Sequence, residues 1–296
     1  MSKTLVDKIA DVFRPQLPLW ACELTSRHVI VAGVNKQRNK VKARLATELP
    51  PQSVVGSLSE TNIKNKEATG ASVLEALNRA GFQGSEIAVI IPDDAVRIAF
   101  LSVENLPKDT EEQRTFICWK LKKTVPFDVD SAQMSFRFLE TRTGSAVDIL
   151  VTLAPLVIIR EYEQLFDSLK IHAGLVTPST LATLNMLPSP SGDTLVLKVA
   201  PDCITTSVFR HGRMQFYRRV VDVSLYDAAY PTVMYYQDKL GGTALEKLVV
   251  CGYDTENRSA VSDLEQKLGL SAHRLEPKEV EDIFKPVLGG VHCATH

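Results

Sequence analysis

Hydrophobic and polar positions over residues 20–91 predict three strands, a helix and a further buried strand. The stretch "WACELTSRHVIVAGV", residues 20–34, indicates two strands joined by a polar turn, and "VKARLATEL" indicates a third strand. "ATGASVLEALNRAG" has helical spacing and ends at Gly81, a residue that suits the left-handed cap of a helix. "EIAVIIP" is a continuous apolar run, which is typical of a buried strand. These elements together predict one compact α/β unit.

The same order of elements returns after the turn-forming segment "SPSG" at residues 189–192. "TLVLKVAPDCITTSVFRHGRMQFYRRVVDV" indicates three strands, and "YDAAYPTVMYYQDKLGG" a helix. The strand "KLVVCG" and the helix "SAVSDLEQKLG" follow. The chain therefore contains a weak internal repeat, visible in the order of its elements more than in its residues.

Residues 93–170 have a different pattern, which predicts an inserted β-α-β-β-α segment. The helix in "DTEEQRTFICWKLKKTVPF" is expected to begin with a capping box of Thr110 and Gln113, and to end before Pro126. "QMSFRFLET" and "AVDILVTLA" indicate two strands, and "PLVIIREYEQLFDSLKIHAG" indicates a second helix. This second helix has one apolar stripe, formed by Ile158, Ile159, Tyr162, Leu165, Phe166 and Leu169.

Composition and charge narrow the class of protein. The chain has 296 residues and a net charge of −1, which argues against a nucleic-acid binder because phosphate neutralisation needs a basic face. The longest apolar run, residues 149–159, is too short to span a bilayer, and the N-terminus lacks the pattern of a signal peptide. The five cysteines have no C-x-x-C spacing, so we expect reduced thiols and a cytoplasmic protein.

Several segments, taken together, resemble one known family. They are "ELPPQSVVGSLSE", "PDDAVRIAFLSVENLP", "KKTVPFDVD", "AGLVTPSTLATLN", "VVCGYDTENRSAVSDLEQKLG" and "FKPVLGG". Their order resembles the PilM family, the cytosolic actin-like components of type IV pilus assembly. The resemblance extends more distantly to the cytosolic domains of type II secretion L proteins and to FtsA. It implies the duplicated actin-like, ribonuclease-H-type α/β fold.

The resemblance also implies a division into subdomains. Residues 1–92 and 171–190 correspond to subdomain 1A, residues 93–170 to the inserted subdomain 1C, and residues 191–296 to subdomain 2A. In the family a further subdomain, 2B, lies between the strand near "FYRRVV" and the helix near "TVMYYQDKLGG". Only a few residues separate these segments here, so 2B is expected to be deleted.

Members of the family bind a nucleotide between two hairpins, but this chain departs from their motifs. The aligned positions are Glu23 and Thr25 in the first hairpin, Lys198 and Ala200 in the second, and Gly252 in the adenosine motif. Thr25 stands where the family has glycine, and a β-branched residue is strained at positive φ. Lys198 replaces a carboxylate and has the wrong charge for Mg²⁺, while Tyr253 would compete with the base for space.

These departures favour a pseudo-ATPase without a cofactor. The alternative is an active actin-fold ATPase with atypical phosphate loops, in which Glu23 still reaches a metal-bound water and ATP and Mg²⁺ still bind.

The resemblance also implies a protein partner. In the PilM family the groove between 1A and 1C holds the cytosolic N-terminal tail of the membrane protein PilN, captured as an extended peptide. The implied positions near that groove are Arg97, Ala99, Trp119, Lys123 and Phe127. Trp and Phe beside basic residues are common interface anchors, although Trp119 could instead only pack 1C onto its own sheet.

We therefore expect a non-enzymatic scaffold that binds a PilN-like bitopic membrane protein and lies at the inner membrane through that partner. A second hypothesis is direct membrane contact through an amphipathic helix at residues 4–13 and a basic turn, which contains Lys36, Arg38, Lys40, Lys42 and Arg44. In the C-terminal "HCATH", His292 and His296 have zinc-compatible spacing, but a frayed chain end is the favoured interpretation and no metal is expected.

Overall fold

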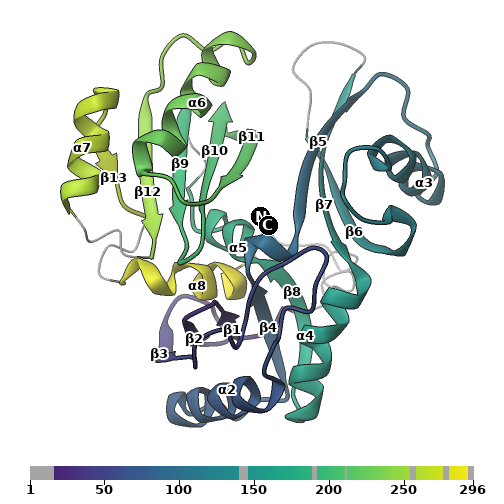
Figure 1. Ribbon diagram of the computed structural model, residues 1–296, viewed down its shortest axis with the longest axis vertical. Coiled ribbons are helices and arrows are strands. Elements are labelled where there is room, and N and C mark those ends of the chain that lie inside the picture. Colours follow the sequence, from purple (N-terminus) through teal and green to yellow (C-terminus); the bar gives the residue numbers. More distant parts are fainter. Residues whose placement is uncertain are drawn as a thin grey trace, which may run out of the picture.

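The computed structural model describes residues 17–139, 146–188, 192–210, 212–253, 258–275 and 280–292. Two five-stranded sheets of matching strand order lie next to each other, and a three-stranded sheet stands beside them (Figure 1). The predicted N-terminal helix at residues 4–13 and most of the tail "HCATH" lie outside the described residues.

The first sheet has the order β3-β2-β1-β4-β8. Its strands are β1 (Trp20–Leu24), β2 (His28–Val34), β3 (Val41–Glu48), β4 (Glu86–Ile91) and β8 (His172–Pro178). The first three strands are antiparallel, and β4 runs parallel to both β1 and β8. The sequence pattern did not indicate β8, because its short segment contains a glycine and shows no clear alternation.

Helices α2 (Lys66–Ala80) and α4 (Leu156–Ser168) pack against one face of the first sheet. Gly81 caps α2 in the left-handed conformation, with φ of 77°, as predicted. The apolar stripe of α4 is buried, which confirms the helix. We had grouped this helix with the inserted segment, but its stripe joins the apolar cluster of β1, β2 and β4.

The second sheet repeats the first with the order β11-β10-β9-β12-β13. Its strands are β9 (Thr194–Val199), β10 (Ile204–Arg210), β11 (Arg213–Val220), β12 (Lys247–Gly252) and β13 (Ala272–His273). Helices α6 (Leu225–Asp238) and α7 (Arg258–Leu268) cover one face. Residues 221–224 form the whole connection between β11 and α6.

The end of the described chain returns to the first sheet. After η3 (Asp282–Phe284), helix α8 (Lys285–His292) packs its apolar side chains against the face of the first sheet opposite α2. Helix α5 (Ser179–Leu184) lies against α8, and a Cβ at Gly289 would come within 1.8 Å of the Ala182 carbonyl oxygen. We had grouped this segment with the second half of the chain.

The third sheet has the order β5-β7-β6 and is the predicted insertion. Its elements are η1 (Asp93–Ala95), β5 (Arg97–Val103), α3 (Thr110–Leu121), η2 (Val129–Ser131), β6 (Ala132–Leu139) and β7 (Val147–Pro155). Helix α3 covers one face, and the other face turns toward the second sheet (Figure 1). We call this sheet with α3 the insertion. The first sheet with α2, α4, α5 and α8 is the first lobe, and the second sheet with α6 and α7 is the second lobe.

The predicted capping box of α3 is wrong by one residue. Asp109 is the N-cap, because its carboxylate accepts hydrogen bonds from the N–H groups of Glu111 and Glu112. The Gln113 side chain instead donates to the Pro107 carbonyl oxygen at 2.9 Å. The helix also ends at Leu121, before Pro126 can restrict it.

Within the described ranges, no helix is long and apolar enough to cross a membrane. Cys22, Cys118, Cys203 and Cys251 are free thiols, and all but Cys118 are buried.

Candidate functional site

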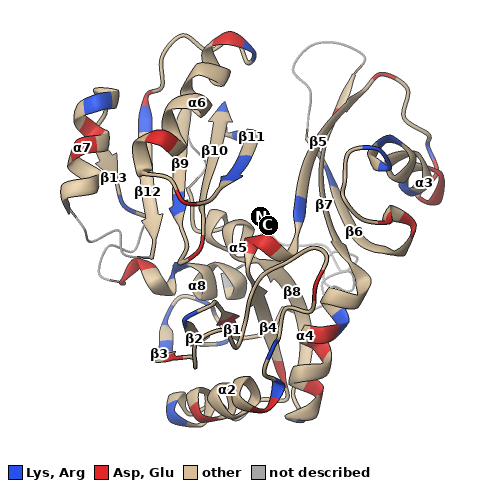
Figure 2. Ribbon diagram, in the orientation of Figure 1, with Lys and Arg blue, Asp and Glu red and all other residues tan. Residues whose placement is uncertain are grey.

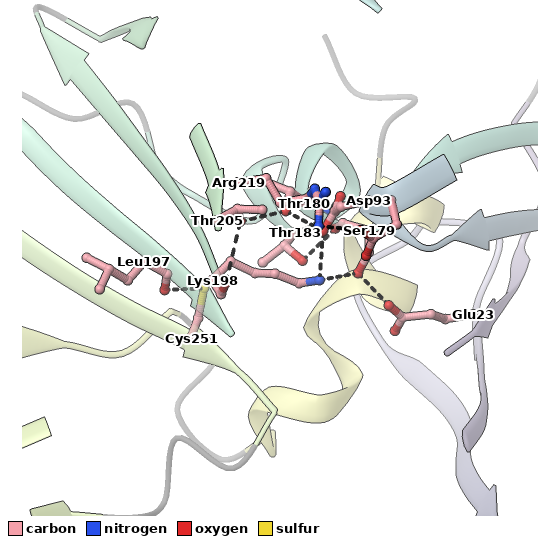
Figure 3. Close-up of polar contacts among 11 residues, drawn as sticks. Glu23, Asp93, Ser179, Thr180, Thr183, Leu197, Lys198, Thr205, Arg219 and Cys251 are labelled. Carbon is pink, nitrogen blue, oxygen red and sulfur yellow. Dashed lines mark hydrogen bonds and ion pairs between the residues drawn. The ribbon is translucent and has the colours of Figure 1, made fainter. Parts of the chain in front are cut away.

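The positions predicted from the nucleotide motifs meet at one place between the two lobes. Strands β1, β4, β9 and β12 each end there, because β4 runs parallel to β1 and β12 runs parallel to β9, and each parallel pair ends on the side of its sheet that faces the other lobe. The last residues of these strands and the turns that follow them carry the side chains of the site, as in other α/β folds. Helix α5 contributes its first residues to the same place (Figure 3).

Lys198 is the centre of this site and is only 3% exposed. It points from β9 of the second lobe into the first lobe (Figure 3). Its Nζ lies 3.2 Å from Asp93 Oδ2 and donates a hydrogen bond of 2.7 Å to Ser179 Oγ. The Ser179 hydroxyl in turn donates to Glu23 Oε1. One ammonium is thus linked to two buried carboxyl groups, to one directly and to the other through a hydroxyl.

Asp93 is also fully satisfied by its other neighbours. The Thr180 N–H donates to Asp93 Oδ1 at 2.8 Å, and the Thr180 hydroxyl donates to Oδ2 at 2.7 Å. Thr205 of β10 completes the set, 2.8 Å from the Thr180 hydroxyl. We call these side chains the cleft network, which consists of Glu23, Asp93, Ser179, Thr180, Lys198 and Thr205.

Burial and charge act against each other in the cleft network. Burial raises the pKa of Glu23 to about 7, although Lys198 and the Ser179 hydrogen bond act in the opposite direction. Burial disfavours the charge on Lys198, but Asp93 and Glu23 outweigh it and raise the pKa of this amine above its usual range. Lys198 is therefore a permanent cation, whereas Glu23 exchanges its proton near neutral pH.

The first hairpin uses its own backbone donors. Thr25 Oγ1 accepts hydrogen bonds from the N–H groups of Arg27 at 3.2 Å and His28 at 2.8 Å. Thr25 does not have a positive φ, so the strain that we predicted for it does not arise. The hydroxyl of Thr25 closes the turn instead, so the N–H groups of Arg27 and His28 are already bonded within the hairpin.

The turn of the second hairpin and the end of β12 are also occupied by contacts within the protein. The Ala200 N–H donates to the Cys203 carbonyl oxygen at 2.8 Å, and Pro201 has no N–H to offer. Gly252 has φ of 107°, and a Cβ there would lie 2.1 Å from the Val199 carbonyl oxygen. Close packing of β12 against β9 therefore explains why a glycine stands at this position.

Further contacts join the two lobes around the cleft network. The Tyr253 ring lies 5.5 Å from the His28 ring and 5.9 Å from Arg27 Cζ. Arg219 of β11 forms an ion pair with Asp94, which follows β4. The cavity beside Lys198 measures only ≈ 20 Å³, which is roughly the space of one water molecule. A wider opening of ≈ 860 Å³ adjoins it. This opening is lined by the turns of both hairpins, with Ser26 and Arg27 from the first and residues 199–204 from the second, and by Asp94, Gln52, residues 54–56 and residues 221–223.

The residues predicted for partner binding fall into two groups. Ala99 and Phe127 pack in the apolar core of the insertion, and Arg97 is exposed at the start of β5. Trp119 is 65% exposed on α3, with Lys120 Nζ 5.2 Å from its ring centroid, and Lys123 is exposed after the helix. Trp119 is thus a surface residue, so the interpretation that it only packs the insertion is wrong.

A groove of ≈ 530 Å³ lies between the insertion and the second lobe. It is lined by Ser135, Phe136, Arg137, Phe138, Leu139, Leu150, Thr152, Leu181, Leu184, Asn185, Phe209, Gly212, Arg213 and Met214. None of the five predicted partner residues is among these. Strand β6 forms one wall and is an edge of its sheet, with β7 as its neighbour on the other side.

The basic turn between β2 and β3 is only partly free. Arg38 donates hydrogen bonds to the carbonyl oxygens of Leu17, Pro18 and Val291, so it ties the two ends of the described chain together. Arg44 lies 5.5 Å from the Phe284 ring centroid. The exposed cations of this turn are Lys36, Lys40, Lys42 and Arg44. Lys and Arg positions are blue in Figure 2.

The sequence motifs indicate Glu23 and Lys198 as site residues, but they do not indicate the residues that bind these two side chains. Asp93 and Asp94 directly follow a predicted buried strand, and Ser179 and Thr180 directly follow β8. The first pair could have been found, because polar residues after a buried strand are common site residues in α/β folds. The second pair could not, because β8 was not predicted.

No protein-family model and no curated protein sequence matches the chain. Solved structures do match. A chain of a structure described as a PilM-PilN type IV pilus biogenesis complex covers 95% of this chain and 100% of its own length, with a TM-score of 0.75 and 16% identity. The chain has a PilM-like, actin-like fold. The predicted fold class is therefore confirmed.

Two further structures share this PilM-like fold more distantly. A Bacteroides thetaiotaomicron protein with an actin-like ATPase fold and unknown function covers 94% of the chain and 98% of its own, with a TM-score of 0.58 and 10% identity. The cytoplasmic domain of EpsL, an inner membrane component of the type II secretion system of Vibrio cholerae, covers 94% of each chain, with a TM-score of 0.53 and 13% identity.

Proposed function

We propose that this protein is a non-enzymatic, PilM-like scaffold in the cytoplasm. It binds the cytosolic N-terminal tail of a PilN-like inner-membrane protein in a type IV pilus or related secretion assembly, and this partner holds it at the membrane. The observation that carries the proposal is the match over nearly the whole chain to a structure described as a PilM-PilN complex. The similar fold of the EpsL cytoplasmic domain supports a role in such an assembly.

The groove beside β6 suits an extended tail. Its walls supply apolar contacts from Leu150, Leu181 and Phe209. The edge of β6 beyond Met134 offers backbone donors and acceptors, whereas the carbonyl oxygens of Ala132 and Met134 already accept from Arg114. An extended peptide that pairs with a sheet edge gains affinity from main-chain hydrogen bonds and specificity from side-chain pockets. Trp119 and Lys123 on the outer surface of the insertion stay a second, separate prediction for partner contact.

Titration calorimetry with the N-terminal cytosolic peptide of the PilN-like protein from the same organism tests the proposal. We expect micromolar binding that weakens at least about tenfold in Phe138→Asp, because this 42% exposed ring lines the groove. The matched control is Val157→Asp, which changes a 72% exposed residue of α4 outside the groove. Trp119→Ala tells whether the second predicted surface contributes. Absence of binding to the unaltered protein at tens of micromolar peptide contradicts the proposal.

The pseudo-ATPase part of the proposal is supported by the state of the nucleotide positions. Lys198 places its own positive charge between the two carboxyl groups, and Thr25 Oγ1 already accepts the N–H groups of Arg27 and His28 in the first hairpin. The ≈ 20 Å³ cavity beside them does not admit a triphosphate, although the wider ≈ 860 Å³ opening reaches both hairpin turns. Mg²⁺ would have to displace an internal ion pair before Glu23 and Asp93 could bind it.

The competing hypothesis of an active ATPase keeps two observations in its favour. The ≈ 860 Å³ opening is lined by both hairpin turns. Glu23 and Asp93 are both present, and carboxylate oxygens are the ligands that Mg²⁺ prefers. Calorimetry with ATP and Mg²⁺ separates the two hypotheses. We expect no binding heat, and clear micromolar binding that disappears in Glu23→Ala would overturn the pseudo-ATPase proposal.

A further inference from the structure

Three elements connect the cleft network to the groove. Helix α5 carries Ser179 and Thr180 of the cleft network and, in its following residues, Leu181 and Leu184 of the groove wall. It has only six residues, so the two sets of side chains belong to one short rigid unit.

Strands β10 and β11 make the same connection from the second lobe. Thr205 of β10 bonds to Thr180, whereas Phe209 of the same strand lines the groove. Arg219 of β11 pairs with Asp94, whereas Met214 at the other end of that strand lines the groove. Each strand is therefore fixed to the first lobe at one end and faces the groove with the other.

The chain segment that leads to the opposite wall of the groove starts at the residues of the same ion pairs. Asp93 and Asp94 form the start of η1, which leads directly into β5 of the insertion. Leu150 and Thr152 on the neighbouring strand β7 line the groove, and they pair with Phe100 and Ile98 of β5. The Lys198–Asp93 and Arg219–Asp94 pairs thus join the second lobe to the segment that carries the insertion.

We propose that these two ion pairs set the width of the groove, so that closure of the cleft network and binding of a tail in the groove are coupled. Lys198 supplies the positive charge that a bound cation would supply, but it cannot dissociate. The groove therefore keeps its width without a bound nucleotide. The identity of the ligand as a PilN-like tail rests on the proposed function. The mechanical link between the ion pairs and the groove does not depend on it. Coupling of this kind is reciprocal, so a bound tail also strengthens the ion pairs.

Distance measurement by pulsed electron paramagnetic resonance tests the mechanical link. Spin labels at Gln133→Cys on β6 and Gln237→Cys on α6 report the separation of the insertion and the second lobe, since both glutamines are exposed. Cys118→Ser and Cys293→Ser remove the cysteines that are not described as buried. The unaltered ion pairs should give one narrow distance distribution.

The test variant is Lys198→Met with Asp93→Asn and Arg219→Gln. The first two changes remove both charges of the buried pair. Glu23, whose pKa burial raises to about 7, stays uncharged without Lys198 when the measurement is made below that pH, and Asp94 keeps contact with water because its side chain is 20% exposed. We expect the mean distance to change by more than about 2 Å, or the distribution to broaden clearly. The matched control is Lys247→Met on the adjacent strand β12, an exposed lysine outside the network, which should leave the distribution unchanged. An unchanged distribution in a variant with native circular dichroism overturns the proposal.

The tail peptide provides the second readout. Its affinity should fall at least about fivefold in the triple variant, although no altered side chain lines the groove. Changed distances with unchanged affinity would overturn the coupling to binding. If the peptide fails to bind even the unaltered protein, the proposed function fails, while the distance measurement still decides whether the ion pairs set the groove.

Discussion

Lys198 changes the chemistry of the cleft because of where its charge lies. A lysine on a surface strand would keep its ammonium in water, but this one is 3% exposed and faces two carboxyl groups from the other lobe. Removing water makes the attraction stronger and also makes any unpaired charge costly. The arrangement therefore favours a closed cleft, and its contribution to stability depends on all partners being present.

Removal of one partner should show this dependence. We expect Lys198→Met to lower the free energy of unfolding by about 3–5 kcal/mol, because Asp93 stays buried without its cation. Lys198→Met with Asp93→Asn should recover most of the loss. Urea unfolding followed by circular dichroism measures both. A double variant as unstable as the single one would mean that lost packing, and not the unpaired charge, explains the effect.

Glu23 should make stability depend on pH. Its pKa is raised from 4.5 to about 7 by burial, so the folded protein holds a proton that the unfolded chain releases at lower pH. The free energy of unfolding should therefore fall as the pH rises from 4.5 through 7, by up to about 3 kcal/mol from this group.

Glu23→Gln isolates this effect, because the amide does not titrate. Its unfolding free energy should vary less between pH 4.5 and 7 than that of the unaltered protein, as measured by urea unfolding at several pH values. The matched control is Glu67→Gln on the exposed surface of α2. Parallel pH profiles for Glu23→Gln and the unaltered protein would contradict the assignment.

At the scale of elements, strand ends and short helices decide what reaches the site. The first hairpin is closed by a threonine hydroxyl, β12 ends in a glycine against β9, and α5 starts with two hydroxyl residues. Each element keeps the position expected in this fold. Its terminal residues, however, form hydrogen bonds and packing contacts with other parts of the chain and not with a ligand. The strand ends have therefore become part of the packing between the lobes.

The glycine at the end of β12 gives a direct test of that packing. Gly252→Ala should cost about 3 kcal/mol or more, because its Cβ would lie 2.1 Å from a carbonyl oxygen at positive φ. Gly241→Ala is the matched control, since φ is 64° there but nothing lies within 4 Å of its Cβ, and about 1 kcal/mol is expected. Thermal or urea unfolding compares the two, and equal losses would contradict the steric explanation.

At the scale of the whole molecule, the last helix of the described chain packs on the first lobe although it follows the second lobe in sequence. Helix α8 follows the second lobe in the chain yet buries its apolar residues against the first sheet. Arg38 further ties Val291 to the start of the described chain. The lobes are therefore joined by the cleft network on one side and by α8 beside it, and we expect them to unfold together.

Leu288→Ala tests this shared core. Leu288 is 1% exposed in α8, so its truncation should cost about 3 kcal/mol and shift the unfolding of the whole molecule. The matched control is Leu74→Ala at a 43% exposed position of α2, expected to change stability by less than about 0.5 kcal/mol. Circular dichroism and tryptophan fluorescence should report one coincident transition. A first lobe that stays folded while the second unfolds would contradict the expectation.

Much of the architecture could be predicted from sequence, because strand alternation, helical stripes and capping residues are local properties. Gly81, the stripe of α4 and the repeated order of three strands, helix and strand all followed from spacing. The exact cap of α3 did not, since Asp109 and Thr110 are both good N-caps and only the backbone geometry selects one. Strand β8 was missed because its stability comes from pairing with β4 and not from its own pattern.

The sequence by itself determined the residue types at the nucleotide positions, and therefore that Lys198 and Thr25 stand where a carboxylate and a glycine are expected. Only the tertiary structure decided what those residues do. Lys198 meets Asp93 and Ser179 across sequence separations that no local pattern encodes, and Thr25 closes its own turn. The groove likewise depends on how the insertion and the second lobe are placed, because its walls come from segments far apart in the sequence.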